Sequence, residues 1–316
     1  MRVVILGAGR MGSAIGACMK RAGDEVILID IFAEHIQKIN EKGLDWQKNE
    51  EKPINVTFDG AFTTPKGQAV CDVAIVLTSG IYTDEVVSGA LGNVIGPDTY
   101  VVTFQNGLGH ADVIAKYVDI DHILHGMLKL GGKIIEPGWV QTLAHPDCCV
   151  TIGSVRQDSK ANEISKKIAA SITTGGIISE HRDDINLAIW EKVLNNCAFN
   201  SIASLARTTM GNVIAGKHGR PILLSCIKEV VDVANAKGIP LNYEKCLEFI
   251  DTHSYKNYKD HFPSMTYDVR AKRNTEIDYL NGAISNYGRE LGIPTPTNDL
   301  LTLLIHCMED GYSYGF

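Results

Sequence analysis

The sequence opens with Met1-Arg2-Val3-Val4-Ile5-Leu6-Gly7-Ala8-Gly9-Arg10-Met11-Gly12, in which a β-branched run meets three glycines spaced G-x-G-x-x-G. The run predicts a strand buried on both faces, and the residues up to Arg21 have the apolar spacing of a helix. In such a turn Gly7 permits the sharp exit from the strand, Gly9 lets a pyrophosphate approach the backbone, and Gly12 allows close helix packing. The phosphate would lie at a helix N-terminus, where N–H groups favour negative charge.

The residues after this turn favour dinucleotide binding over an ordinary glycine turn. Gly23 closes the helix, and Glu25–Asp30 forms a second predicted strand that ends in an acid. An acid at this offset accepts a hydrogen bond from the adenosine ribose. The predicted cofactor residues here are Gly7, Ala8, Gly9, Arg10, Met11, Gly12 and Asp30. The alternative is a glycine turn in another α/β fold, because the motif alone is common.

Strands and helices alternate through the first half of the chain, which is typical of a doubly wound parallel sheet. The predicted elements are a helix over Ala33–Lys42, a polar segment over Leu44–Gln68 with a short strand at Ile54–Phe58, strands over Cys71–Thr78, Tyr100–Phe104 and His122–Met127, and helices over Tyr82–Leu91 and Ala161–Thr173. We expect turns at Gly131–Gly132 and Pro137–Gly138, short antiparallel strands at Trp139–Thr142 and Cys148–Ile152, and a last edge strand at Gly176–Ser179.

Polar residues follow the strand that ends at Phe104. Ligands of open α/β sheets bind outside the carboxyl ends of the strands. Gln105 and Asn106, with Thr78 and Ser79 at the end of the preceding strand, are therefore further candidate cofactor contacts. The alternative is a plain Asn-Gly turn at Asn106.

From Asp183 onward helical periodicity dominates, with predicted breaks at Gly211, Gly216–Pro221, Gly238–Pro240, Pro263 and Gly292–Pro296. The sequence therefore predicts an α/β protein with two domains. Residues 1–182 would form a dinucleotide-binding domain of the Rossmann type, with a doubly wound sheet. Residues 183–316 would form an all-helical substrate and catalytic domain.

Three polar residues share one face of the first helix in this second part. Lys192, Asn196 and Asn200 are spaced i, i+4 and i+8, while Trp190 and Val193 belong to its apolar surface. A buried lysine without a partner is costly and asparagine is a poor helix former, so this face is suited to lining a polar pocket. The alternative is a helix whose polar face meets solvent.

Composition excludes several classes of function. The formal net charge of −7 is opposite to that of a nucleic-acid-binding surface, and no apolar run reaches the length of a membrane span. The strand at the first residues leaves no room for a signal peptide, and eight cysteines without a C-x-x-C pair indicate reduced, mostly buried thiols, so we expect a cytoplasmic protein. The ten histidines lack metal-ligand spacing, so no metal site is expected.

Four segments of the sequence together resemble the ketopantoate (2-dehydropantoate) reductase family, and the resemblance covers essentially the whole chain. The resemblance rests on Gly7–Gly12, Gln105–Gly107, the helix of Trp190–Asn200, and the segment from Ser264 to Asp278. It implies NADPH-dependent reduction of 2-dehydropantoate to (R)-pantoate in pantothenate biosynthesis. It also implies that Lys192 is the general acid, that Glu276 binds the substrate hydroxyl, and that Asn106, Asn196, Asn200 and Ser264 hold the substrate.

The residue types suit this chemistry, because reduction of a 2-oxo acid creates an alkoxide that a lysine ammonium can stabilise and protonate. Two positions depart from the family. Asp30 stands near the place of an arginine and Ser79 in the place of a lysine, both of which NADPH-using members often carry. The family resemblance implies NADP as the cofactor. Asp30 and Ser79 instead favour NAD, since an acid repels a 2′-phosphate. His261 and Met210 stand where asparagines are expected in the substrate pocket.

Two alternatives therefore stay open beside the leading interpretation. One is an NADH-dependent reductase of another branched 2-oxo acid, a D-2-hydroxy acid dehydrogenase, and the other is a non-catalytic dinucleotide sensor. The expected partner is a small 2-oxo acid, with no nucleic acid and no membrane, and a homodimer is left open. We expect the active site where the two domains meet, with Lys192 near Glu276.

The segment from Ser264 to Glu276 carries a conformational prediction. As one straight helix it would separate its ends by roughly 18 Å, too far for one small substrate to touch both. We therefore predict a break close to Arg273. Asn274 or Thr275 would then be the N-cap of a new helix with Glu276 in its first turn, and Ser264 the N-cap of the preceding one.

Overall fold

The structure, a computed structural model, describes residues 1–156 and 159–314 and divides into two compact units. Unit 1 comprises Met1–Gln105 and His110–Ile185, and unit 2 comprises Asn106–Gly109 and Asn186–Phe316. The chain therefore enters unit 2 for four residues, returns to unit 1, and enters unit 2 again at Asn186.

The main sheet of unit 1 has eight strands, which are β1 (Arg2–Leu6), β2 (Glu25–Ile29), β5 (Gly60–Phe62), β6 (Val73–Val76), β7 (Tyr100–Thr103), β8 (Ile123–Leu128), β11 (Val150–Ser154) and β12 (Ser179–His181). Their order is β12-β11-β8-β7-β6-β1-β2-β5. Neighbouring strands in the stretch β8-β7-β6-β1-β2-β5 of this order are parallel, and β11 runs antiparallel to β8. The order changes direction between β1 and β6, so the predicted doubly wound sheet is confirmed. The edge strand predicted over Gly176–Ser179 lies further along the chain, at Ser179–His181, because Gly176 has a φ of +119° and belongs to the turn after α5.

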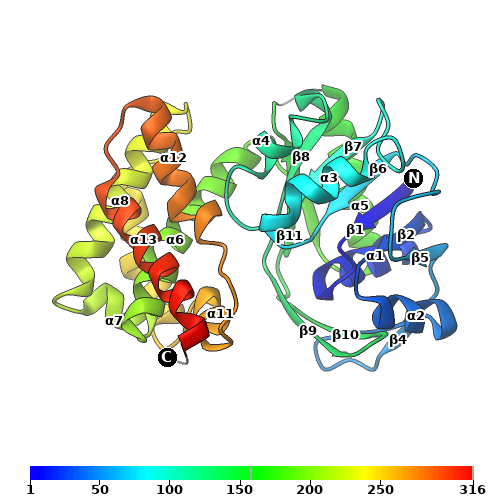
Figure 1. Ribbon diagram of the computed structural model, residues 1–316, viewed down its shortest axis with the longest axis horizontal. Helices are drawn as coiled ribbons and strands as arrows, with labels where there is room; N and C mark the ends of the chain where they lie inside the picture. The colour runs from blue at the N-terminus through cyan, green and yellow to red at the C-terminus, as the bar shows by residue number, and fades with distance from the viewer. Residues whose placement is uncertain (157–158, 315–316) are drawn as a thin grey trace. The chain divides into compact units, whose positions relative to one another are not determined.

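Helices cover both faces of this sheet (Figure 1). One apolar cluster joins α1 (Arg10–Arg21) and α5 (Ser159–Gly175) to one face, and a second joins α3 (Thr83–Ala90) and α4 (His110–Ile114) to the other. The central strands therefore need apolar side chains on both faces, and Val3, Val4 and Ile5 are fully buried.

A second, four-stranded sheet was not expected. It has the order β4-β3-β10-β9, with β3 (Leu44–Lys48), β4 (Ile54–Val56), β9 (Leu130–Glu136) and β10 (Trp139–Ala144). The prediction of a turn at Gly131–Gly132 is wrong, because both glycines lie inside β9. A Cβ at Gly132 would lie 2.6 Å from the Gln141 oxygen and 3.0 Å from the Met11 side chain, so glycine here allows close packing instead of a turn.

Unit 2 is helical, as predicted. Its elements are α6 (Ile185–Ala206), α7 (Met210–Ala215), α8 (Gly219–Ala236), α9 (Tyr243–Phe249), α10 (Tyr255–Tyr258), α11 (Ser264–Arg270), the 3₁₀ helix η4 (Ile277–Tyr279), α12 (Asn281–Leu291), α13 (Pro296–Asp310) and the 3₁₀ helix η5 (Gly311–Tyr314). The predicted break at Gly211 is wrong, because Gly211 lies inside α7. A Cβ at this position would lie 2.6 Å from the Lys259 oxygen, so glycine permits a close backbone approach there.

All eight cysteines are free thiols and most of them are buried, as predicted. Burial raises the pKa of Cys18 to about 12, so this thiol stays protonated. None of the helices in the described residues is both long enough and apolar enough to span a membrane.

Candidate functional site

The glycine turn between β1 and α1 has the geometry that its spacing predicts. Gly7 has a φ of +101°, and a Cβ there would lie 2.6 Å from the backbone nitrogen of Thr78. A Cβ at Gly12 would lie 1.9 Å from the Gly7 oxygen, whereas one at Gly9 would meet nothing within 4 Å. Gly9 is also the N-cap of α1 and, having no side chain, leaves the first N–H groups of the helix without a side-chain cap. The backbone is therefore open at the end of a helix whose first N–H groups suit a phosphate.

A cavity of about 620 Å³ lies beside this turn, at the carboxyl ends of β1, β2, β5 and β6. Of the predicted cofactor residues, Gly7, Asp30 and Thr78 line it. The others do not, and these are Ala8, Gly9, Arg10, Met11, Gly12, Ser79, Gln105 and Asn106. Ile31, which is 90% exposed, and Tyr82 add apolar surface to its wall. A cavity at this end of a doubly wound sheet fits the adenosine part of a dinucleotide.

Asp30 and Lys66 bring opposite charges to this cavity. The Asp30 carboxylate accepts a hydrogen bond of 2.8 Å from the Phe32 backbone nitrogen, which fixes the carboxylate at the end of β2. Lys66 was not predicted from the sequence. Lys66 follows the turn Thr63-Thr64-Pro65 at the end of the short strand β5. Its position could have suggested a ligand contact, but the periodicity of the sequence did not reveal β5.

The buried His35 is linked to the glycine turn through hydrogen bonds. The Gly138 backbone nitrogen donates to Nδ1 of His35 (2.9 Å), so Nε2 carries the proton of the neutral ring and faces Oγ of Ser13 at 3.2 Å. Ser13 in turn donates to the Ala8 oxygen at 2.7 Å. Burial lowers the pKa of His35, although the Asp30 carboxylate acts in the opposite direction. The ring is therefore neutral at pH 7 and joins α2 (Ala33–Lys42) to the turn.

The Gln105 side chain makes hydrogen bonds within unit 1. Its amide nitrogen donates to the Thr78 oxygen at 3.1 Å and to the Thr83 hydroxyl at 2.9 Å, and its amide oxygen accepts from Thr103 at 3.0 Å. Gln105 thereby ties the end of β7 to the turn after β6, which carries Thr78 and Ser79.

In unit 2, three of the predicted site residues form one hydrogen-bonded chain. Asn106 donates to the Glu276 carboxylate at 3.3 Å and accepts from the Asn196 amide at 3.1 Å. The turn that carries Asn106 packs on η4, because the Leu108 backbone nitrogen donates to the Tyr279 oxygen at 2.8 Å. A Cβ at Gly107 would lie 2.2 Å from that oxygen, so only glycine fits there. Residues 170 positions apart are thus brought together.

Helix α6 contributes the other polar residues. Lys192 lies one helical turn before Asn196 and is half-buried, and Asn200 lies one turn after it and is 3% exposed. Trp190 stacks on Tyr287 of α12, with ring centroids 6.1 Å apart, on another side of the helix. This face is therefore largely withdrawn from solvent, contrary to the solvent-facing alternative.

Ser264 and Glu276 lie on separate elements, as predicted. α11 ends at Arg270, and η4 begins at Ile277 with Glu276 as its N-cap. The prediction that Asn274 or Thr275 caps a new α-helix is wrong, because a single 3₁₀ turn forms there, although the Thr275 hydroxyl accepts from the Ile277 nitrogen at 3.3 Å. Ser264 is not an N-cap either. Pro263 occupies that position, and Ser264 is exposed at the first position of α11.

Met210 and His261, which stand where asparagines are expected, lie side by side. The Met210 backbone nitrogen donates to the His261 oxygen at 3.0 Å, which links the start of α7 to the turn before α11. Neither residue belongs to the chain of Asn106, Asn196 and Glu276.

Comparisons with known proteins agree along the whole chain. The family model described as "Ketopantoate reductase PanE/ApbA" matches residues 3–157, and that described as "Ketopantoate reductase PanE/ApbA C terminal" matches residues 184–309. A 2-dehydropantoate 2-reductase of Streptococcus pyogenes is 30% identical over 310 residues, with 98% of each chain covered. That of Lactococcus lactis is 29% identical over 318 residues, with the same coverage.

Two solved structures are similar in fold over the same length. D-mandelate dehydrogenase with NADH and anilino(oxo)acetate has a TM-score of 0.84 and 28% identity, with 99% of each chain covered. The 2-dehydropantoate 2-reductase from Geobacter metallireducens has a TM-score of 0.80 and 24% identity, and the alignment covers 97% of this chain and 99% of that one.

Proposed function

The chain belongs to the ketopantoate reductase family and is an NAD(P)-dependent oxidoreductase, and from this premise we propose that it reduces 2-dehydropantoate to (R)-pantoate. The observation that supports this most is the hydrogen-bonded chain of Asn106, Asn196 and Glu276 beside Lys192 on α6. These residues combine one cation, one carboxylate and neutral amides, which is the set that a 2-oxo acid and its developing alkoxide require.

The residues of unit 1 fit a dinucleotide. The uncapped N-terminus of α1 and the open backbone at Gly9 would hold the pyrophosphate, and Asp30 would accept a hydrogen bond from the adenosine ribose. When bound, the reduced nicotinamide supplies the hydride that reduces the keto carbon.

The residues of unit 2 would then position the substrate and move the proton. We assign the role of general acid to Lys192, whose ammonium would stabilise the substrate oxygen and donate a proton to it. Asn196 and Asn200 on the same face, with Asn106 and Ser264, would orient the substrate without adding charge. Glu276 fixes the Asn106 amide and would bind the substrate hydroxyl.

For the cofactor we propose a preference for NADH. Asp30 lines the cavity at the adenosine end, where a carboxylate favours the ribose hydroxyl and repels a 2′-phosphate. Lys66 in the same cavity acts in the opposite direction, so the preference depends on the balance of these two charges.

Two observations favour a second candidate, an NADH-dependent reductase of another branched 2-oxo acid. Asp30 agrees with NADH, and the similar D-mandelate dehydrogenase was solved with NADH and anilino(oxo)acetate. The sensor alternative has no such support, since the family is one of oxidoreductases.

A substrate panel separates the two candidates. Values of kcat/KM are measured for 2-dehydropantoate, 3-methyl-2-oxobutanoate, 4-methyl-2-oxopentanoate and phenylglyoxylate, each with NADH and with NADPH. The proposal requires 2-dehydropantoate to have the highest value. A higher value for another 2-oxo acid would transfer the assignment to the second candidate, and no turnover of any of them would contradict both.

A further inference from the structure

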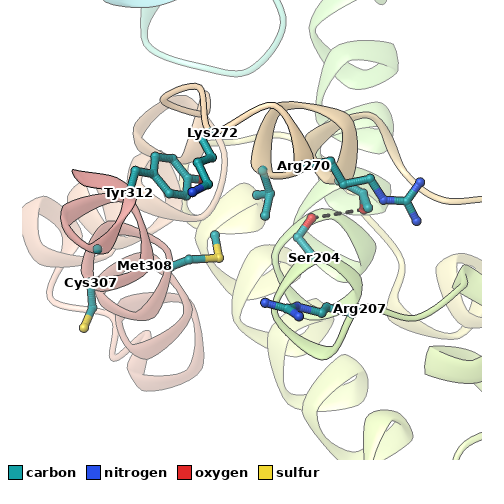
Figure 2. A pocket seen from close by; sticks show the side chains of 10 residues that line it. Ser204, Arg207, Arg270, Lys272, Cys307, Met308 and Tyr312 are labelled. Atoms are coloured by element: carbon teal, nitrogen blue, oxygen red, sulfur yellow. Dashed lines mark hydrogen bonds between the residues drawn. The ribbon is translucent and has the colours of Figure 1, made fainter. Parts of the chain in front are cut away.

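Unit 2 contains a second cavity, of about 520 Å³, that the proposed reaction does not use. The ends of α6 and α11 and the last turn of α13, with the start of η5, line it (Figure 2). None of Lys192, Asn196, Asn106 and Glu276 is among its lining residues. Its volume lies within the range of small-molecule sites, roughly 300–1,000 Å³.

Two of its lining residues hold an unusual backbone conformation. Arg207 has a φ of 51° and Lys272 a φ of 52°, in the left-handed region that favours glycine. Each follows a helix, and the hydrogen bonds from Thr208 to Ala203 and from Arg273 to Asp268 close the two helix ends in the same way. Glycine is the usual residue at such a position, yet both positions carry a long cation. Backbone strain of this kind gathers at ligand-binding sites.

The cations in the wall of the cavity have no acidic partner in that wall. No acid lines it, and in the described part of the chain neither Arg207 nor Lys272 forms an ion pair. Of the acids next to lining residues in the sequence, Asp268 pairs with Arg273 at 2.7 Å and Glu309 accepts from the Thr275 nitrogen at 2.7 Å. Asp310 precedes the lining residue Gly311 but does not itself line the cavity. The helix ends offset part of the positive charge, but each is equivalent to only about half a unit charge.

The third cation of the cavity has another role. The Arg270 guanidinium lies over the Phe262 ring at 4.3 Å and points away from Met308 in Figure 2, whereas Arg207 points toward the side of Met308. Arg270 therefore contributes its aliphatic stem, and the other two cations of the lining are the exposed side chains of Arg207 and Lys272.

The remaining wall is mostly apolar, with Val269, Met308 and the ring of Tyr312. Ser204 and Thr266 are buried in it and bond to each other at 3.2 Å. The Tyr312 hydroxyl is buried and has no hydrogen-bond partner among the described residues. Burial, with the nearby Glu309 and Asp268, raises the pKa of Tyr312, so the phenol keeps a proton that it can donate.

We propose that this cavity binds a small organic anion with an apolar body. Arg207 and Lys272 hold its charged group, the Tyr312 hydroxyl donates to it, and the apolar body lies against Val269 and Met308. Two cations without acidic partners account for the charge of the ligand, and the apolar wall accounts for its body. This site is separate from the substrate site, so it stands or fails independently of the proposed reaction.

Calorimetric titration of the full chain with sodium hexanoate tests the proposal. We expect saturable binding of hexanoate, and no saturation with hexylammonium, which lacks the negative charge, or with inorganic phosphate, which lacks the apolar body. Phosphate binding as tight as that of hexanoate would overturn the apolar part of the proposal. Absence of hexanoate binding would overturn the whole of it.

The variants Arg207→Gly and Lys272→Gly locate the site. Each removes a cation and also relieves the left-handed backbone, so each variant should unfold at a temperature no lower than the original chain. Each should weaken hexanoate binding by about tenfold or more, the usual effect of losing a charge-assisted hydrogen bond. Arg289→Gln, on α12 and outside the cavity, is the matched control for loss of a cation, and Lys192→Ala is the control for the substrate site. Binding that falls only in Lys192→Ala would place hexanoate in the substrate site and contradict the proposal.

Discussion

The amide of Asn106 has both of its ends engaged, since it donates to Glu276 and accepts from Asn196. Its orientation is therefore determined by two residues that come from different elements, α6 and the N-cap of η4. A side chain held in this way can orient a substrate without moving when the substrate binds. At the scale of single residues, the proposed site depends on such fixed neutral groups around one cation.

Lys192→Ala tests the role of that cation. Removal of a positioned proton donor lowers kcat by about 10²-fold or more, because the alkoxide then takes its proton from water. The measurement is kcat at saturating cofactor and substrate. Lys228→Ala, on an exposed lysine of α8 that pairs with Asp232, is the matched control and should leave kcat unchanged. Full turnover in Lys192→Ala would remove Lys192 from the mechanism.

Asp30→Asn tests the cofactor preference. Loss of the carboxylate removes repulsion of a 2′-phosphate and leaves Lys66 to attract it, so the ratio of kcat/KM for NADPH to that for NADH should rise by about tenfold. Glu34→Gln removes an equal charge from the first turn of α2 and should not change the ratio, since Glu34 does not line the cavity. If Asp30→Asn leaves the ratio unchanged as well, Asp30 does not contact the ribose.

At the scale of elements, buried polar side chains join segments that packing alone would leave independent. His35 on α2 accepts from Gly138, in the turn between β9 and β10, and faces Ser13 on α1. The second sheet is thereby attached to the glycine turn, and Trp46 on β3 donates to Thr142 on β10 at 3.0 Å. The segment after α2 forms strands in spite of its polar composition because β3 pairs with β10 and buries Leu44 and Trp46.

The neutral His35 makes stability depend on pH. Burial lowers its pKa in the folded chain from the ordinary value of 6.5, so below that pH the unfolded chain binds a proton that the folded chain does not. Stability should therefore fall with acidification below about pH 6.5, by at most about 1.4 kcal/mol per pH unit from this group. Denaturant unfolding at pH 7.5 and at pH 5.5 measures the effect.

Two variants make that experiment specific to His35. His35→Gln should be less stable at pH 7.5 and should lose less stability on acidification than the original chain. His145→Gln, on an exposed histidine, should keep the original pH dependence. An equal loss in His35→Gln and in the original chain would show that other groups cause the dependence.

At the scale of the whole molecule, the chain contributes to unit 2 in two separate stretches. Residues Asn106–Gly109 leave unit 1 after β7 and belong to the helical unit, where they pack on η4. Asn106 therefore reaches Glu276 because the chain crosses from one unit to the other at this turn. The break in the sequence near Asp183 corresponds to the second entry of the chain into unit 2, at Asn186.

Gly107→Ala tests the importance of this crossing. The new Cβ would lie 2.2 Å from the Tyr279 oxygen at a φ of +104°, so the turn must shift and displace Asn106. We expect a loss of stability of about 2 kcal/mol or more, from strain and overpacking together, and a fall in kcat/KM. Gly23→Ala, at a φ of +96° without any atom within 4 Å, isolates the strain and should leave kcat/KM unchanged. Equal effects of the two variants would show that the contact with Tyr279 is unimportant.

Much of the secondary structure of this protein follows from the local sequence alone. The spacing of Gly7, Gly9 and Gly12, the buried β-branched strands and the helical second half follow from backbone sterics and from the periods of helix and strand, which act within a few residues. The separation of Ser264 from Glu276 was predicted in the same way, from helix geometry. Family resemblance named Asn106, Asn196 and Glu276, and the structure joins these three.

The tertiary structure alone decided how distant segments pair. β3 pairs with β10 across almost a hundred residues, Lys66 lies beside Asp30 in one cavity, and Gly132 and Gly211 lie inside regular elements where breaks were predicted. Each of these depends on what approaches the residue from elsewhere in the chain, such as the Gln141 oxygen at Gly132 or the Lys259 oxygen at Gly211. A glycine that marks a turn and a glycine that admits a neighbouring backbone are identical in sequence, and only packing distinguishes them.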